Sequence, residues 1–146
     1  MTHNEKAMKI FDDKFNCAQA VFGAFAEELG MSEEQAMDIA LCFSGGMRRG
    51  ETCGAVSGGL MVFGLKYGEP GPDEDEQEVK MKAYSLASKF MERFQQENGS
   101  CNCKDLLGCD PSTEDGHEYA LKNNLFYDIC PKKIESAIRI LEELLQ

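Results

Sequence analysis

Four cysteines occupy positions at which a helix is predicted to begin, and thiols at such positions are suited to redox or metal chemistry. They are Cys17, Cys53, Cys103 and Cys130. The first turn of a helix carries partial positive charge and free N–H donors, which favour the thiolate over the thiol. The thiolate is the form of cysteine that attacks disulfides and binds metals. If the fold brings these helix ends together, the protein holds a cluster of activated sulfur atoms.

The residues around the first two cysteines indicate how their helices begin. Asn16 and Gln19 have the spacing of a capping box, which makes Cys17 the first residue of its helix. Thr52 is predicted to cap the next such helix, which Cys53 then begins. Both cysteines are therefore expected in the first turn of a helix.

The other two cysteines are placed by similar signals. Ser100 is predicted to cap a short helix that contains Cys103. Cys130 is followed by Pro131, a residue favoured at the first helical position because its missing N–H is not needed there. Cys130 is then itself expected at the cap.

The elements that must position these cysteines are predicted to be helices. Apolar residues recur at helical spacing along most of the chain, and no segment shows the sustained alternation of a strand. We therefore predict an all-α single domain over residues 1–146, a bundle of about five or six helices with a loop-rich, cysteine-bearing segment from Ser100 to Cys130. The main helices are expected at Asn4 to Asp13, Cys17 to Leu29, Ser32 to Cys42, Cys53 to Tyr67, the acidic run Asp73–Glu76 to Gln96, and Pro131 to Leu145.

Small residues fill the first half of the helix predicted at Cys53 to Tyr67. Gly54, Gly58 and Gly59 are poor helix formers, so their presence predicts that another backbone approaches this helix closely. The glycine-rich segment before it, Ser44 to Gly50, is predicted to form a turn. Its two arginines, at positions 48 and 49, could also raise the positive potential near the following cysteine and help it to ionise.

Composition limits the classes of function. The formal net charge of −11 would repel phosphate backbones, so no nucleic-acid partner is expected. No apolar stretch is long enough to span a bilayer, and the N-terminus lacks the basic start and apolar core of a signal peptide. We therefore expect a cytoplasmic protein. In a reducing compartment, seven cysteines indicate metal binding or catalysis more often than structural disulfides.

Three of the seven cysteines lie outside the helix-start pattern. Cys42 falls in an apolar helical run and is expected to be a buried packing residue. Cys101 and Cys109 flank Cys103, and the sequence leaves open which sulfur is used in that segment. His117 is expected to be an exposed residue of the loop-rich segment.

The four cysteine segments together resemble the C_GCAxxG_C_C family, whose members are described as redox-active on the strength of their cysteines. The resemblance runs nearly from end to end of the chain and keeps the family's order of segments. The matching segments are Phe15–Val21, Phe43–Met47 with Gly50–Gly58, Gly99–Gly108, and Cys130–Pro131 with the closing helix.

The resemblance implies redox activity but no settled reaction. Members are often encoded near transporter genes, which implies a transporter-linked context. The family is also similar to part of the split-Soret cytochromes, which carry haem and an iron–sulfur cluster. This sequence contains no Cys-x-x-Cys-His motif, so covalent haem is not supported.

Two classes of function follow from the cysteines. In the first, a thiol–disulfide protein, Cys53 is predicted to attack, Cys130, Cys103 or Cys17 to resolve, and a partner redox protein to exchange electrons. In the second, a binding or electron-transfer protein, Cys17, Cys53, Cys103 and Cys130 together hold an iron–sulfur cluster or a zinc ion. The sequence leaves open whether the protein is an enzyme, which electron partner it uses and its oligomeric state.

Overall fold

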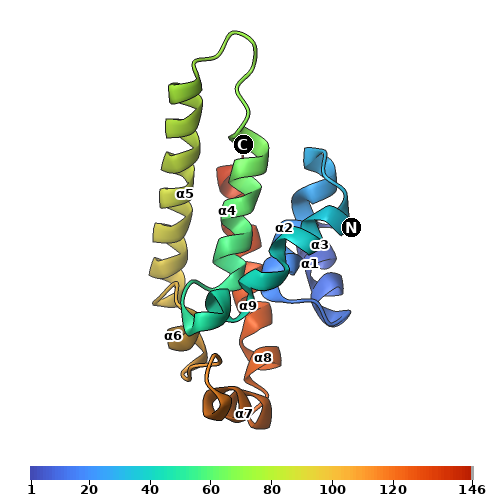
Figure 1. Cartoon of the computed structure of the whole chain (residues 1–146), viewed down its shortest axis with the longest axis vertical. Coiled ribbons are helices and arrows are strands. Elements are labelled where there is room, and N and C mark those ends of the chain that lie inside the picture. Colours follow the sequence, from blue (N-terminus) through green and yellow to red (C-terminus); the bar gives the residue numbers. More distant parts are fainter. Residues whose placement is uncertain (146) are drawn as a thin grey trace.

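Helix α2 (Cys17–Ala26) is the central element of the fold, in a computed structural model that describes residues 1–145. Every α2 residue after Cys17 is buried, and neighbouring helices surround it on several sides (Figure 1). Its composition explains this position, because alanine, valine and phenylalanine occupy nearly the whole segment. The other α-helices are α1 (His3–Asp12), α3 (Glu33–Ala40), α4 (Gly54–Tyr67), α5 (Glu76–Asn98), α6 (Cys103–Leu107), α7 (Glu114–Lys122), α8 (Leu125–Asp128) and α9 (Cys130–Leu144).

The prediction of an all-α fold is confirmed. Within residues 1–145 there is no β-strand, and one isolated bridge joins Thr52 to Asn102. The helices are more numerous than expected, because α6, α7 and α8 are short helices inside the segment that was predicted to be mostly loop. None of the described helices is both long and apolar enough to cross a membrane.

Helices α2 and α4 pack with their backbones in close approach, as the small residues of α4 predicted. A Cβ atom at Gly58 would lie 2.8 Å from the carbonyl oxygen of Ala18, and one at Gly54 would lie 2.9 Å from the Ala18 backbone nitrogen. Those distances are too short for a side chain at either position. The glycines therefore allow the first turns of α2 and α4 to lie side by side.

The long helix α5 and the closing helix α9 complete the bundle. Helix α5 packs against α4 and α9, and its buried residues are Phe90 and Phe94. The ring of Phe90 lies directly over Gly59, where a Cβ would come within 2.5 Å of it. In Figure 1, α4 and α9 begin in the lower half of the molecule and run upward, with α6, α7 and α8 gathered around that lower end. The fold thus brings the starts of α4, α6 and α9 together.

Candidate functional site

The first structural element of the site is the short pairing of two loops that carry cysteines. The Cys53 N–H donates to the Cys101 carbonyl at 2.7 Å, and the Cys103 N–H donates to the Glu51 carbonyl at 2.6 Å. Thr52 and Asn102 lie opposite each other between these hydrogen bonds. This pairing fixes the start of α4 beside the start of α6.

The starts of α2 and α4 place Cys17 and Cys53 in the first turn of a helix. The predicted capping box is confirmed, because Asn16 accepts from the Gln19 N–H and the Gln19 side chain accepts from the Asn16 N–H, both at 2.9 Å. The prediction that Thr52 caps α4 is wrong. Cys53 itself is the cap residue, since Thr52 is engaged in the bridge to the other loop.

The starts of α6 and α9 also differ in detail from the prediction. Asn102 is the cap residue of α6, and Ser100 instead accepts from the Asn102 N–H at 2.9 Å. Helix α9 begins at Cys130, one residue earlier than expected, because Ile129 already has helical backbone angles and continues from α8. Each of the four cysteines is therefore a cap residue or the first residue of a helix.

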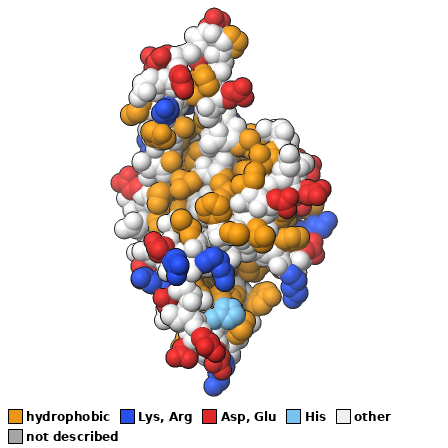
Figure 2. All heavy atoms as spheres, in the orientation of Figure 1, with side chains coloured by type: hydrophobic (Ala, Val, Ile, Leu, Met, Phe, Trp, Pro, Cys, Tyr) orange, Lys and Arg blue, Asp and Glu red, His pale blue; other side chains and the backbone are white. Residues whose placement is uncertain are grey.

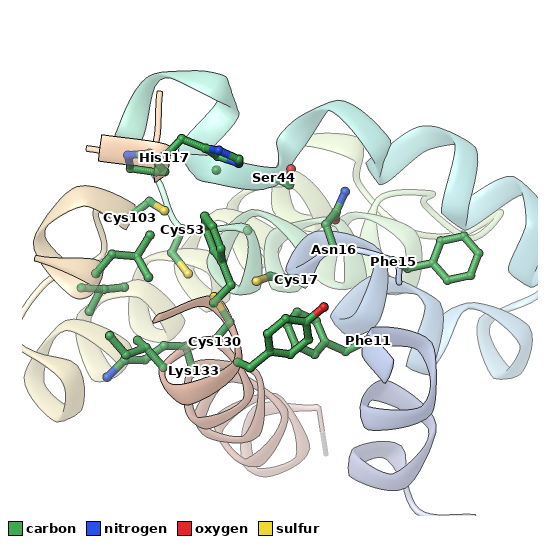
Figure 3. A pocket seen from close by; sticks show the side chains of 18 of the residues that line it. Phe11, Phe15, Asn16, Cys17, Ser44, Cys53, Cys103, His117, Cys130 and Lys133 are labelled. Atoms are coloured by element: carbon green, nitrogen blue, oxygen red, sulfur yellow. The ribbon is translucent and has the colours of Figure 1, made fainter. Parts of the chain in front are cut away.

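These four cysteines line one cavity of about 300 Å³. Figure 3 shows the sulfur atoms of Cys17, Cys53, Cys103 and Cys130 in the same part of this cavity, although they come from four different helix starts. The remaining wall is largely aromatic and aliphatic. It includes Phe11, Phe126, Tyr127, Leu106, Leu107, Leu121 and Pro111.

Two of the thiols form a hydrogen-bonded pair with opposite pKa shifts. The Cys17 thiol donates to the Cys130 sulfur, which raises the pKa of Cys17 well above its usual range and lowers that of Cys130. The nearby ammonium of Lys133 and the backbone N–H of Cys130 also lower the pKa of Cys130. Cys130 is therefore the sulfur of this pair that ionises first.

Burial raises the pKa of the other two thiols. The pKa of Cys53 rises to about 11, although the backbone N–H groups of Ala55 and Val56 oppose the shift. The pKa of Cys103 rises to about 12 through burial and repulsion by Cys53 and Cys130. At Cys53 the effect of burial on the pKa is therefore larger than the opposing effect of the two N–H donors at the helix start, because a thiolate is strongly destabilised when it is removed from water.

The charged residues around the cavity are all basic. Lys14, Arg48 and Lys133 line it, together with His117, and no aspartate or glutamate does. In Figure 2, several Lys and Arg side chains lie below the hydrophobic middle of the face shown, close to a His side chain, with Asp and Glu beside and below them. The chain as a whole carries a net charge of −11, whereas the charged side chains that line this cavity are positive.

Comparison with known proteins agrees with this arrangement of cysteines. A family model described as "Putative redox-active protein (C_GCAxxG_C_C)" matches residues 15–144. The chain belongs to the C_GCAxxG_C_C family. A protein of Archaeoglobus fulgidus that is described as uncharacterised is 30% identical over 107 residues, which cover 69% of this chain and 71% of that protein. No solved structure matches the chain.

The structure separates the four family cysteines from the three additional ones. Cys101 lies outside the cavity wall, and its thiol donates to the Met91 carbonyl at 3.5 Å. Cys109 follows α6 and also lies outside the wall, so Cys103 is the sulfur of this segment that faces the cavity. The expectation that Cys42 is buried is wrong. Helix α3 ends at Ala40, and the tight turn that follows leaves Cys42 exposed.

The arrangement of the cysteines does not match a ready metal centre. Thiolates are suitable ligands for zinc and for iron–sulfur clusters. Nevertheless, among residues 1–145 no group of three or more His, Cys, Asp or Glu side chains is arranged to hold a metal ion. All seven cysteines carry free thiols in this structure.

Sequence reasoning missed the contributions of His117 and Lys133 to the wall. His117 is exposed, as expected, but it lies in α7 rather than in a loop, and its ring packs 5.6 Å from that of Phe126. Lys133 lies three residues after Cys130 and so shares its face of α9. The spacing of three residues could therefore have predicted from the sequence that Lys133 lies near Cys130.

A chain of hydrogen bonds holds Lys133 beside the cavity. The Lys133 ammonium donates to the side-chain oxygen of Asn98 at 3.0 Å, and the Asn98 amide donates to Ser136 at 3.0 Å. Ser136 in turn donates to Glu97, which forms a double hydrogen bond with Arg139 at 2.7 and 2.8 Å. The network ties the end of α5 to the first turns of α9.

Replacing Glu97 by glutamine is expected to weaken the protein in a pH-dependent way. Hydrogen bonds from Arg139 and Ser136 lower the pKa of Glu97 to about 2, so its contribution to stability is present above the ordinary glutamate pKa and is lost as the pH falls toward 2. Because the pair is partly exposed, the loss at pH 7 is about 0.5–1 kcal/mol. Chemical denaturation of the parent and variant at several pH values measures it.

The matched control is Glu92→Gln on the same helix, because Glu92 is also exposed but forms no ion pair among the described residues. It is expected to have little effect at any pH. If Glu97→Gln destabilises the protein as much at pH 2 as at pH 7, the ion pair is not the source of the effect.

Proposed function

We propose that this protein exchanges a Cys17–Cys130 dithiol with disulfide bonds and so transfers two electrons. The observation that carries the proposal is that the two thiols line one cavity and shift each other's pKa in opposite directions, so that a sulfur that ionises readily lies beside one that keeps its proton. An attacking thiolate next to a protonated resolving thiol is the arrangement that thiol–disulfide exchange requires. The description of the family as redox-active agrees with this chemistry.

The reaction begins at Cys130. Its thiolate attacks one sulfur of a substrate disulfide, so a mixed disulfide forms and the other half leaves and takes up a proton. The Cys17 thiol then loses its proton and attacks the Cys130 sulfur, which releases the second half as a thiol. Two electrons have passed to the substrate, whose disulfide has become two thiols, while Cys17 and Cys130 have become a disulfide. A dithiol reductant, such as a partner redox protein, restores the starting state.

Attack is assigned to Cys130 rather than to Cys53, which the sequence favoured. Cys53 and Cys103 have raised pKa values and are mostly protonated near neutral pH. They line the same cavity as the first pair and lie on two paired loops. We propose that they act as a second dithiol, which reduces the Cys17–Cys130 disulfide by becoming a disulfide itself.

Mapping the first disulfide to form tests this function. The protein is purified without air, reduced, freed of reductant and mixed with one equivalent of a small disulfide, and its remaining thiols are alkylated at low pH. Mass spectrometry of the peptides is expected to show a Cys17–Cys130 disulfide before any other. A first disulfide through Cys42 or Cys109 would contradict the proposal. So would tightly bound iron and sulfide, or zinc, that protects all four family cysteines from alkylation.

A further inference from the structure

We propose that the cavity selects low-molecular-weight disulfides that carry carboxylate groups and an apolar body. This inference rests on the proposed function and adds the class of substrate to it. Three features of the cavity support it: its basic lining, its apolar wall and the placement of Arg48.

The basic residues of the wall are not neutralised by the protein itself. Among the described residues, Lys14, Arg48 and Lys133 form no ion pair with a carboxylate. The Lys14 ammonium lies 5.8 Å from the ring centre of Tyr127, and Arg48 donates to the hydroxyl of Ser44 at 3.2 Å. Each cation therefore has donors left for a bound anion, since lysine carries three N–H donors and arginine five.

One carboxylate close to the cavity, that of Asp110, is hydrogen-bonded outside it. Asp110 is close enough to raise the pKa of Cys103, but it lies outside the cavity wall. Its side chain accepts from the N–H and hydroxyl of Ser112 at 2.9 and 2.6 Å. The cavity wall itself therefore offers a bound anion cations and apolar side chains, while Glu114 and Glu118 line the adjoining pocket on the other side of Arg48 and His117.

The two cations nearest the reaction have different roles. Lys133 acts on the pKa of Cys130, whereas Arg48 is not among the groups that shift it. Arg48 instead donates to Ser44, which Figure 3 shows on the other side of the pocket from Cys130 and Lys133. A disulfide whose sulfur meets Cys130 can therefore reach Arg48 with a carboxylate further along the molecule.

The backbone of the Arg48 loop is held in an unusual conformation. Gly45, Gly46, Met47 and Arg48 all have left-handed backbone angles, with φ between 59° and 67°. For a residue other than glycine this conformation is strained, because Cβ lies too close to the following carbonyl oxygen. Gly46 cannot be replaced, because a Cβ there would lie 2.3 Å from the Glu51 nitrogen. Strain of this kind is concentrated at functional sites, where it fixes a side chain in place.

The apolar wall indicates what the rest of the substrate molecule should be. Phe11, Phe126 and Tyr127 line the same cavity as the four cysteines. Apolar and aromatic walls with a few charged groups are typical of small-molecule sites of about 300 Å³. A disulfide with an aromatic or aliphatic body and terminal carboxylates matches both parts of the wall.

The test compares two aromatic disulfides that differ in charge. Dithiobis(nitrobenzoate) carries a carboxylate on each half, and dithiodipyridine is neutral. Both release a coloured thiol, so stopped-flow absorbance gives a second-order rate constant for each. The measurements use a background in which Cys42 and Cys109, which lie outside the cavity, are replaced by serine. The quantity compared is the ratio of the anionic to the neutral rate constant.

Arg48→Gln is expected to lower this ratio about tenfold, because a charge-assisted hydrogen bond to the carboxylate is lost. Using the ratio cancels any change in the reactivity of the attacking thiol. The matched control is Arg49→Gln, since Arg49 is the adjacent arginine and does not line the cavity. Its ratio is expected to equal that of the parent.

The outcomes separate the two proposals. If the parent reacts through Cys130 with both disulfides but Arg48→Gln and Arg49→Gln change the ratio equally, or not at all, the substrate class is wrong and the exchange function stands. If Cys130 reacts with neither disulfide faster than an ordinary exposed thiol does, the exchange function is wrong. A fall in the ratio for Arg48→Gln alone supports both.

Discussion

In the background that lacks Cys42 and Cys109, replacing Cys130 by serine is expected to slow the first exchange with a small disulfide by at least about tenfold at pH 7. The remaining cavity thiols are poor substitutes. The pKa of Cys53 is raised from 9.0 to about 11, so at this pH Cys53 is ionised roughly 100-fold less than a thiol without that shift. Its greater intrinsic nucleophilicity recovers only about tenfold of that deficit. Because the pKa of Cys130 is lowered, the true difference is expected to be larger.

Cys17→Ser is the matched variant for this prediction. The serine hydroxyl can still donate to the Cys130 sulfur, so attack is expected to continue. Without a resolving thiol, the mixed disulfide on Cys130 persists, and one equivalent of thiol is released instead of two. Mass spectrometry of the intact protein shows the adduct directly.

Pulse alkylation of the parent gives an independent check on the same assignment. As the pH is raised, labelling of Cys130 is expected to begin before that of Cys17, Cys53 or Cys103, because Cys130 is the thiol of the four whose pKa is lowered. Peptide mass spectrometry separates the four sites from the exposed Cys42. Earlier labelling of Cys53 would restore it as the attacking thiol and overturn the assignment made from the structure.

The second large effect is expected at the contact between α2 and α4. In Gly58→Ala the new methyl group would lie 2.8 Å from the Ala18 carbonyl oxygen and 3.2 Å from Val21 Cβ, so the two helices must separate. Overpacking of this kind costs about 1–3 kcal/mol, against a gain of up to about 1 kcal/mol in helix propensity. The net result is a less stable protein, measured as a lower thermal midpoint.

Gly64→Ala is the control, because the same substitution in the same helix meets open space. No atom lies within 4 Å of a Cβ at Gly64, and the residue is exposed. The variant is expected to be as stable as the parent or more stable, since alanine favours the helix by up to about 1 kcal/mol. Equal stabilisation by both substitutions would show that α2 and α4 are not in close contact at Gly58.

Some helix starts could be predicted from the sequence, because the hydrogen bonds that cap them join residues only a few positions apart. The Asn16–Gln19 capping box acts over three residues, so it was predicted correctly, as was the close approach at Gly54 and Gly58. Thr52 shows the limit of such reasoning. Its side chain is a good cap, but the pairing with Asn102 comes from a distant segment and takes precedence. Likewise, Cys42 follows an apolar pattern, yet the end of α3 turns it outward.

The sequence by itself determined the helical class and the family, and it singled out the four cysteines that the fold brings to one cavity. These properties depend on periodicity and on segments that can be recognised in order along the chain. Only the tertiary structure decided which of those cysteines can ionise. Burial and the partner of each thiol set its pKa, and both depend on what distant segments place around it. Burial raises the pKa of Cys53, the thiol that the sequence favoured for attack. Cys17 lowers the pKa of Cys130, although the two residues are more than a hundred positions apart in the sequence.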